Sequence, residues 1–278
     1  MFTPSAASKY ATLPSGAKAR YVERPAFGPT LILLHGGSCS LESWDAVADR
    51  LQDKARIIAL DMPGHGLTGP TPQADYSPLA MVGFLHEFVL SLGLDRFAIA
   101  GHSMGGHVAW RYALEHPERV SNLALVAPGG LADPTGVPGV GMKFSATEEG
   151  RAAMRAAASR ERTETGLRAM FHVQEAVTPD VVDRNWAMAS RPGALEATQS
   201  RFQAPMFEPA AIMRLGEIAA PTLVIWGKDD NVFAPELSRM LTGAIGDSRL
   251  VTYERCGHFP QEEYPERTAD DIAEFLRE

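Results

Sequence analysis

Ser103 stands in the glycine-rich segment GHSMG at residues 101–105, whose spacing is typical of a catalytic serine. An apolar run at residues 97–100 precedes the segment and a helix-like stretch follows it, which predicts a sharp strand-to-helix turn. Such a turn needs a positive φ at the serine, and glycines two positions before and after it avoid collisions with neighbouring backbone. The amino terminus of the following helix adds partial positive charge beside the serine oxygen. We therefore predict that Ser103 is a nucleophile for acyl transfer.

A serine hydroxyl attacks readily only when a base accepts its proton, and a carboxylate commonly orients that base. Of the eight histidines, His258 fits best because it follows the last strand-like run in a Gly-His turn, at the sheet edge expected for Ser103. Asp229 and Asp230 follow the preceding run, and we favour Asp230 as the carboxylate with Asp229 as the alternative. The predicted triad is then Ser103, Asp230 and His258, in that chain order.

Acyl transfer also needs backbone N–H groups that stabilise the developing oxyanion. The segment HGGS at residues 35–38 follows the first apolar run, and we predict the N–H groups of Gly37 and Met104 as the two donors. An ordinary strand-to-helix turn would need the same glycines, so this alternative stays open. The segment DMPGHG at residues 61–66 follows the second run, and its glycines and proline indicate a shaped loop with a structural role.

The elements that must position these residues are predicted from short apolar runs. They are continuously apolar, or nearly so, which favours strands covered on both faces, as in a parallel sheet. The runs are residues 31–34, 57–60, 97–100, 123–126, 222–226 and 250–253. Helix-length segments separate most of them, at residues 41–51, 78–92, 104–115, 235–241 and 265–276. Residues 9–23 read as an antiparallel edge hairpin, so the sequence predicts an α/β protein.

One connection is much longer than an ordinary crossover. About 95 residues separate the fourth run from the fifth. The segment opens with a Gly/Pro-rich connector, and prolines interrupt the helix-forming stretches that follow it. We predict a helical cap at residues 128–217 over the carboxyl edge of the sheet, with residues 1–127 and 218–278 forming the core.

Composition narrows the classes of partner. A net charge of −8 and the lack of any basic cluster argue against nucleic acid, and no apolar run reaches the roughly 18 residues that span a membrane. The amino terminus lacks the features of a secretory signal, so we expect a cytoplasmic protein, a monomer or homodimer, that binds a small molecule. The two cysteines, Cys39 and Cys256, are too few for a disulfide framework, and they have no metal-binding spacing.

Five segments together closely resemble the α/β-hydrolase superfamily. They are HGGS at 35, DMPGHG at 61, GHSMGG at 101, WGKDD at 226 and CGHFPQEEYPE at 256. The resemblance implies a mostly parallel eight-stranded sheet flanked by helices, a helical cap inserted after the sixth strand, and catalysis without metal or organic cofactor. Relatives with haloalkane dehalogenase or epoxide hydrolase activity carry aspartate at the nucleophile position, so Ser103 argues against both activities.

Within the superfamily the chain resembles carboxylesterases and the carbon–carbon hydrolases that cleave ring-fission products of aromatic catabolism. Arg184 stands at about the position of a substrate-binding arginine in the second group. That group usually has asparagine before the nucleophile and tryptophan after the histidine, where this chain has His102 and Phe259. The residues expected to contact substrate are Ser38, His102, Arg184, Trp186 and Phe259.

The leading functional hypothesis is a serine hydrolase that cleaves a carboxylic ester of a small, largely apolar substrate through an acyl-enzyme. A carbon–carbon hydrolase acting on vinylogous 1,5-diketones is the alternative, and hydroxynitrile lyases and cofactor-free perhydrolases share the same triad. A hypothesis of another class is a catalytically silent α/β-hydrolase fold that binds a ligand. Such proteins commonly lack a triad member, whereas all three residue types are present in this sequence.

Overall fold

The computed structural model describes residues 7–131, 159–203 and 208–277. Eight strands form one sheet in the order β1-β2-β4-β3-β5-β6-β7-β8. The strands are β1 Ser8–Thr12, β2 Lys18–Arg24, β3 Thr30–Leu34, β4 Arg56–Leu60, β5 Phe97–His102, β6 Val120–Val126, β7 Thr222–Gly227 and β8 Ser248–Tyr253. The β1–β2 hairpin pairs antiparallel with β4, and the strands from β4 to β8 pair in parallel. The predicted mostly parallel eight-stranded sheet is confirmed.

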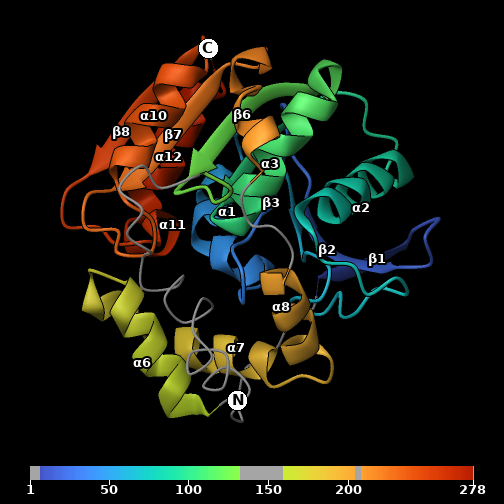
Figure 1. Ribbon diagram of the computed structural model, residues 1–278, viewed down its shortest axis with the longest axis vertical. Coiled ribbons are helices and arrows are strands. Elements are labelled where there is room, and N and C mark those ends of the chain that lie inside the picture. Colours follow the sequence, from blue (N-terminus) through green and yellow to red (C-terminus); the bar gives the residue numbers. More distant parts are fainter. Residues whose placement is uncertain (1–6, 132–158, 204–207, 278) are drawn as a thin grey trace.

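Helices cover both faces of the sheet (Figure 1). The core helices are α1 Asp45–Leu51, α2 Pro78–Ser91, α3 Met104–Glu115, α10 Glu236–Ala244, α11 Pro260–Glu263 and α12 Pro265–Phe275. Short 3-10 turns lie at Leu41–Trp44, Pro117–Arg119, Gln174–Ala176 and Leu215–Glu217.

Successive side chains of a strand point to opposite faces. In β3, Leu31 and Leu33 accordingly pack in the cluster that contains α1 and α12 residues, whereas Ile32 and Leu34 pack with residues of α2 and α3. Burial on both faces explains why the strand is continuously apolar.

The described part of the chain between β6 and β7 is helical. Its helices are α6 Arg160–Met170, α7 Pro179–Ala189, α8 Ala194–Gln203 and α9 Pro209–Ile212. Figure 1 shows α6, α7 and α8 together at one end of the sheet, away from the helices that cover its faces. A small apolar cluster joins this cap to the core, with Leu167, Phe171, Val177 and Val182 packed against Cys39 and Phe259. Most of the predicted connector, at residues 132–141, lies outside the described residues, as do residues 142–158 and 204–207, and the domain boundaries stay a prediction.

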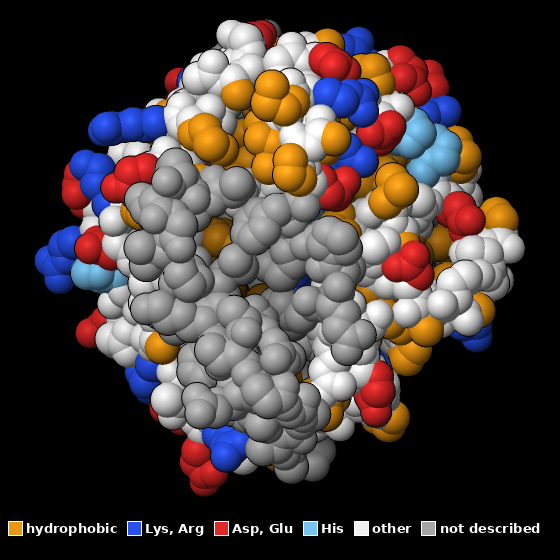
Figure 2. Space-filling model, viewed as in Figure 1, with side chains coloured by type: hydrophobic (Ala, Val, Ile, Leu, Met, Phe, Trp, Pro, Cys, Tyr) orange, Lys and Arg blue, Asp and Glu red, His pale blue; other side chains and the backbone are white. Residues whose placement is uncertain are grey.

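Charged side chains of both signs are interspersed over the described residues of the face seen in Figure 2. In the described ranges, no helix is both long enough and apolar enough to cross a bilayer. The cytoplasmic location and the absence of membrane partners stay predictions.

Candidate active site

Ser103 occupies the turn between β5 and α3 with a φ of 51°. A Cβ built on Gly101 would lie 2.4 Å from the carbonyl oxygen of Gly105, and one built on Gly105 would lie 2.4 Å from that of Leu34. Both positions therefore exclude a side chain, as the spacing predicts. The Ser103 N–H donates to the carbonyl of Val126 at 3.0 Å, which ties the turn to the neighbouring strand β6. The nucleophile candidate is thus held by backbone contacts that only glycine permits.

The structure brings the three predicted triad residues into one hydrogen-bonded chain. The Ser103 Oγ lies 3.0 Å from His258 Nε2, and His258 Nδ1 lies 2.9 Å from Asp230 Oδ2. The other oxygen of Asp230 accepts hydrogen bonds from the N–H groups of Val232 and Phe233 at 2.8 and 3.1 Å. Asp230 and His258 are both buried, at 6% and 3% exposure. A carboxylate satisfied in this way can hold the imidazole with Nε2 directed at the serine.

Asp229, the alternative carboxylate, points elsewhere. Its side chain is 47% exposed, and its Oδ2 lies 3.5 Å from Nδ1 of His172, a residue of the cap. The geometry therefore distinguishes between the two neighbouring aspartates, which the sequence alone could only rank.

The predicted oxyanion turn lies directly against the nucleophile. A Cβ built on Gly36 would lie 3.3 Å from the Ser103 Cβ. His35 links this turn to the loop after β4. Its Nδ1 donates to the Gly36 carbonyl at 2.7 Å, and its Nε2 accepts from the Met62 N–H at 3.0 Å. Burial lowers the pKa of His35, which keeps the ring neutral for this pair of bonds. The peptide that joins Gly36 to Gly37 is planar and trans, so the Gly37 N–H faces away from the His35 ring.

A family model described as the alpha/beta hydrolase fold matches residues 29–265. The chain belongs to this family. The α/β hydrolase is 31% identical over 264 residues to mouse monoacylglycerol lipase ABHD6, an alignment that covers 91% of this chain and 77% of that protein. It is 28% identical over 261 residues to the 2-hydroxy-6-oxo-6-phenylhexa-2,4-dienoate hydrolase of Comamonas testosteroni, with 90% and 88% covered.

Solved structures show the same fold. A meta-cleavage product hydrolase from Pseudomonas fluorescens superimposes with a TM-score of 0.84 at 23% identity, over 97% of both chains. A putative lipase from Acinetobacter baumannii AYE gives a TM-score of 0.86 at 24% identity, over 97% of this chain and 90% of the other.

In this α/β hydrolase, the loop that carries His258 is fixed from two sides. The His258 N–H donates to the carbonyl of Met170 at the end of α6, and Nε2 of His102 donates to the His258 carbonyl at 2.8 Å. Burial and the neighbouring His258 ring lower the pKa of His102 well below its usual value, so His102 is neutral. His102 was predicted to contact substrate. In the structure its ring is buried, and its hydrogen bond to the His258 carbonyl holds the histidine loop in place.

Glu263 is a supporting residue that the sequence analysis missed. Its buried carboxylate accepts hydrogen bonds from the N–H groups of Gly257 and Phe259 beside His258, at 3.0 and 3.1 Å. It also accepts from the cap residues His172 and Val173, at 2.9 Å each. One side chain thus connects the cap to the turn that carries the candidate base.

Three further residues predicted to contact substrate are not among the residues that line the two cavities described below, and their substrate contacts stay predictions. Phe259 stacks on Phe171 with ring centroids 4.5 Å apart, within the cluster that joins cap and core. Trp186 is 38% exposed. The Arg184 side chain is 12% exposed, and its guanidinium pairs with the Glu262 carboxylate and donates to a backbone carbonyl of the core. The positions of these three side chains depend on which residues they pack against or pair with, and on which face of its helix each residue lies. The sequence does not specify either.

Two of the cavities lined by described residues lie near the triad. The smaller, of about 50 Å³, contains Ser103 and Met104 and is otherwise mainly apolar, with Tyr76, Pro78, Met81, Val108 and Phe233 in its wall. Arg201 of α8 also lines it, and its guanidinium lies 2.9 Å from a Cβ built on Gly37. Burial lowers the pKa of Arg201 to about 10, which still leaves a cation near neutral pH. No pattern in the sequence indicated this residue.

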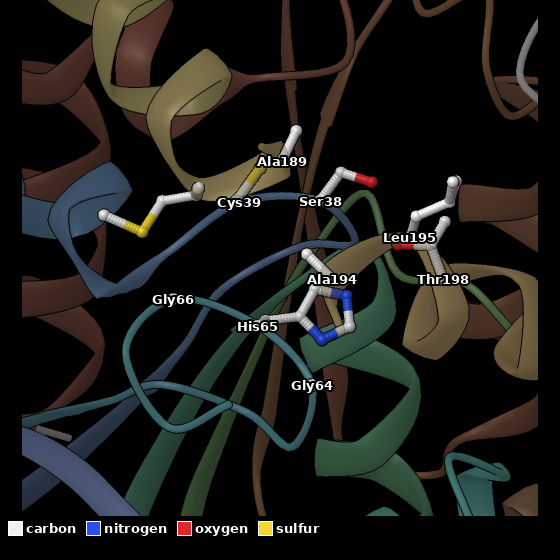
Figure 3. A pocket seen from close by; sticks show the side chains of 10 residues that line it. Ser38, Cys39, Gly64, His65, Gly66, Ala189, Ala194, Leu195 and Thr198 are labelled. Atoms are coloured by element: carbon white, nitrogen blue, oxygen red, sulfur yellow. The ribbon is translucent and has the colours of Figure 1, made fainter. Parts of the chain in front are cut away.

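The larger cavity, of about 140 Å³, lies between the core and the cap helices α7 and α8 (Figure 3). Ser38, one of the residues predicted to contact substrate, lines it. Its polar wall comes from Ser38, Cys39, His65 and Thr198, and its apolar wall includes Met188 and Leu195. Burial raises the pKa of the Cys39 thiol to about 12, so this thiol is not a nucleophile near neutral pH. Within the described ranges, no group of three or more His, Cys, Asp or Glu side chains is placed to hold a metal ion.

Proposed function

We propose that this α/β hydrolase cleaves carboxylic esters with a small, largely apolar acyl group, and that Ser103 forms the acyl-enzyme. The observation that carries the proposal is the unbroken chain from the Ser103 hydroxyl through His258 to the buried Asp230 carboxylate. The apolar wall of the cavity around Ser103 suits an acyl chain.

The proposed cycle follows from the positions of these groups. His258 Nε2 accepts the hydroxyl proton as Ser103 Oγ attacks the ester carbon, and the N–H groups of Gly37 and Met104 stabilise the resulting oxyanion. The C–O bond to the alcohol then breaks, and the imidazolium donates its proton to the leaving oxygen. Water, deprotonated by His258, attacks the acyl-enzyme and releases the acid. Asp230 stays ionised and stabilises the imidazolium.

Carbon–carbon bond hydrolysis is the second candidate function. The similarity to the dienoate hydrolase supports it, and so does the Arg201 cation in the Ser103 cavity, because a dienoate is an anion. We favour ester hydrolysis because of Arg184. The resemblance to carbon–carbon hydrolases suggested that this arginine binds the anionic substrate, but its charge is already neutralised by the ion pair with Glu262. A neutral ester needs no such partner.

The test compares the wild-type protein with Ser103→Ala and with a control, Ser91→Ala, whose hydroxyl only donates to a carbonyl of α2. Turnover of p-nitrophenyl butyrate should fall on the order of 10⁴-fold or more in Ser103→Ala and stay unchanged in Ser91→Ala. A fluorophosphonate probe should label the wild type and the control but not Ser103→Ala, since only an activated serine reacts.

Each other outcome has a defined meaning. Undiminished turnover by Ser103→Ala would refute the assignment of the nucleophile. A wild type that the probe does not label would favour a catalytically silent binding protein. Faster turnover of a vinylogous 1,5-diketone than of any ester would replace the ester reading by the carbon–carbon hydrolase.

A further inference from the structure

His65 carries a buried polar atom that is not satisfied. The side chain is 5% exposed, and its Nδ1 lies 2.8 Å from the Pro63 carbonyl, so Nδ1 bears the proton and donates. Nε2 is then an acceptor, and it has no hydrogen-bond partner among the described residues. Buried polar atoms are normally paired, so an unpaired one in a cavity wall calls for a ligand group.

Figure 3 shows the ring of His65 in the wall of the larger cavity, with the nitrogen remote from its Cβ directed toward the side of Ser38, Ala194 and Leu195. Burial, followed by the nearby His35 and Arg201, lowers the pKa of His65 to about 3. The ring is therefore neutral near pH 7, and its free atom can only accept. A hydroxyl fits such an atom, whereas a carboxylate or phosphate does not.

The rest of the cavity wall agrees with a neutral, partly polar ligand. Within the described ranges its lining contains no Asp, Glu, Lys or Arg. Hydroxyl groups of Ser38 and Thr198 stand beside the apolar side chains of Met188 and Leu195. A single water needs about 10–15 Å³ by a comparable measure, so the space of about 140 Å³ admits a small alcohol group.

This cavity lies within one substrate length of the nucleophile. Gly36 contacts Ser103, and Ser38, two residues further along the chain, lines the cavity. Two residues of extended chain span at most about 7 Å. Helix α8 covers both cavities, since Thr198 lines the larger and Arg201, one turn later, lines the smaller. An ester whose carbonyl oxygen points at Gly37 can therefore place its acyl and alcohol parts in different cavities.

We propose that the larger cavity binds the alcohol part of the ester, and that His65 Nε2 accepts a hydrogen bond from a hydroxyl of that alcohol. The preferred substrates are then monoesters of a diol or polyol. The inference rests on the proposed ester hydrolysis, and it gives a binding role to a segment whose sequence indicated structure alone.

Three butyrate esters test the inference, because they share one acyl-enzyme and differ only in the alcohol. They are 2-hydroxyethyl butyrate, propyl butyrate and 2-fluoroethyl butyrate, whose fluorine withdraws electrons as a hydroxyl does but cannot donate. The kcat/KM of the wild type should be about tenfold higher for the hydroxyethyl ester than for either of the others, as one hydrogen bond to a buried acceptor predicts.

His65→Asn is the decisive variant. Its amide can still donate to the Pro63 carbonyl in place of Nδ1, but it has no acceptor at the Nε2 position. The preference for the hydroxyethyl ester should fall to within about twofold of unity, while the control His86→Asn, on α2, keeps the tenfold preference. Circular dichroism establishes that each variant is folded.

Equal kcat/KM values for the three esters in the wild type would overturn this inference alone, as would an unchanged preference in His65→Asn. No turnover of any of the three esters, with no fluorophosphonate labelling, would instead overturn the proposed ester hydrolysis, and the alcohol site with it.

Discussion

Replacing Glu263 by glutamine tests whether one carboxylate holds the histidine turn and the cap together. The change keeps the size of the side chain but turns one acceptor oxygen into an NH₂ donor. One oxygen of Glu263 accepts from Gly257 and Phe259, and the other accepts from His172, Val173 and Gly257. Because the Gly257 N–H contacts both oxygens, it keeps an acceptor in either orientation of the new amide. The amide leaves unpaired either the Phe259 N–H or the N–H groups of His172 and Val173, and its own NH₂ group faces N–H donors instead of acceptors.

The structure sets the size of the effect. Each buried donor left unpaired costs about 1–3 kcal/mol, so the free energy of unfolding should fall by about 3 kcal/mol once partial relaxation is allowed for. In a protein of this size, 1 kcal/mol corresponds to a shift of about 2–4 °C in Tm, which predicts a decrease of about 6–12 °C. The kcat for an ester should fall as well, because the lost bonds flank His258.

Thermal unfolding followed by circular dichroism measures the shift, and Glu266→Gln is the matched control. Glu266 lies three residues later, and its side chain is 61% exposed in an ion pair with Arg50. Such surface pairs contribute about 0–1 kcal/mol, so the control should unfold close to the wild type. If Glu263→Gln and Glu266→Gln unfold at the same temperature, the carboxylate of Glu263 does not hold the turn as argued.

The two remaining predictions concern the triad carboxylate and a buried histidine. Asp230→Asn should lower kcat on the order of 10⁴-fold while Asp229→Asn changes it little, and equal losses would show that the geometry misassigns the carboxylate. Burial, with smaller contributions from His35 and Arg201, lowers the pKa of His65 from 6.5 to about 3, so between these pH values the unfolded chain binds a proton that the folded protein does not. The free energy of unfolding should therefore decrease as pH falls below 6.5, and His65→Asn should lose about 2 kcal/mol less than the wild type between pH 7.5 and pH 5 in urea unfolding. If the free energy of unfolding of the two proteins falls equally between these pH values, His65 is not a neutral, buried residue as argued.

The sequence predicted the fold and the meeting of Ser103, Asp230 and His258, because both follow from the order of the strands and the turns after them. Continuously apolar runs separated by helical segments predict a parallel sheet, and residues that follow parallel strands meet at one sheet edge. Ser103 and Asp230 come after β5 and β7, and His258 follows β8, so the topology alone brings them together. The glycines at 101 and 105 could be understood in advance, since a tight turn excludes side chains whatever surrounds it.

The sequence could not place the predicted substrate contacts where their positions depend on partners remote in the chain, and those contacts stay predictions. Arg184 is neutralised by Glu262, 78 residues away, and nothing in the sequence specifies that pairing. Glu262 and Glu263 are neighbours in the sequence, yet they serve different partners, since Glu262 pairs with Arg184 and the buried Glu263 accepts from the histidine turn and the cap. His65 and Arg201 became candidates for substrate binding only because they line cavities. Local sequence patterns do not predict cavities.

The end of the cap helix α6 contacts the backbone of the histidine turn. A Cβ built on Gly257 would lie 2.5 Å from the Met170 carbonyl and 2.7 Å from the His172 N–H nitrogen, so the end of α6 packs directly against the backbone beside His258. The His258 N–H itself donates to Met170. Moving this end of α6 away would leave the buried His258 N–H unpaired and would remove the N–H groups of His172 and Val173 from the Glu263 carboxylate, and each buried group left unpaired would cost about 1–3 kcal/mol. The end of α6 is therefore part of the framework that positions the imidazole, and its contribution to the site differs from that of α7 and α8, which line the cavities.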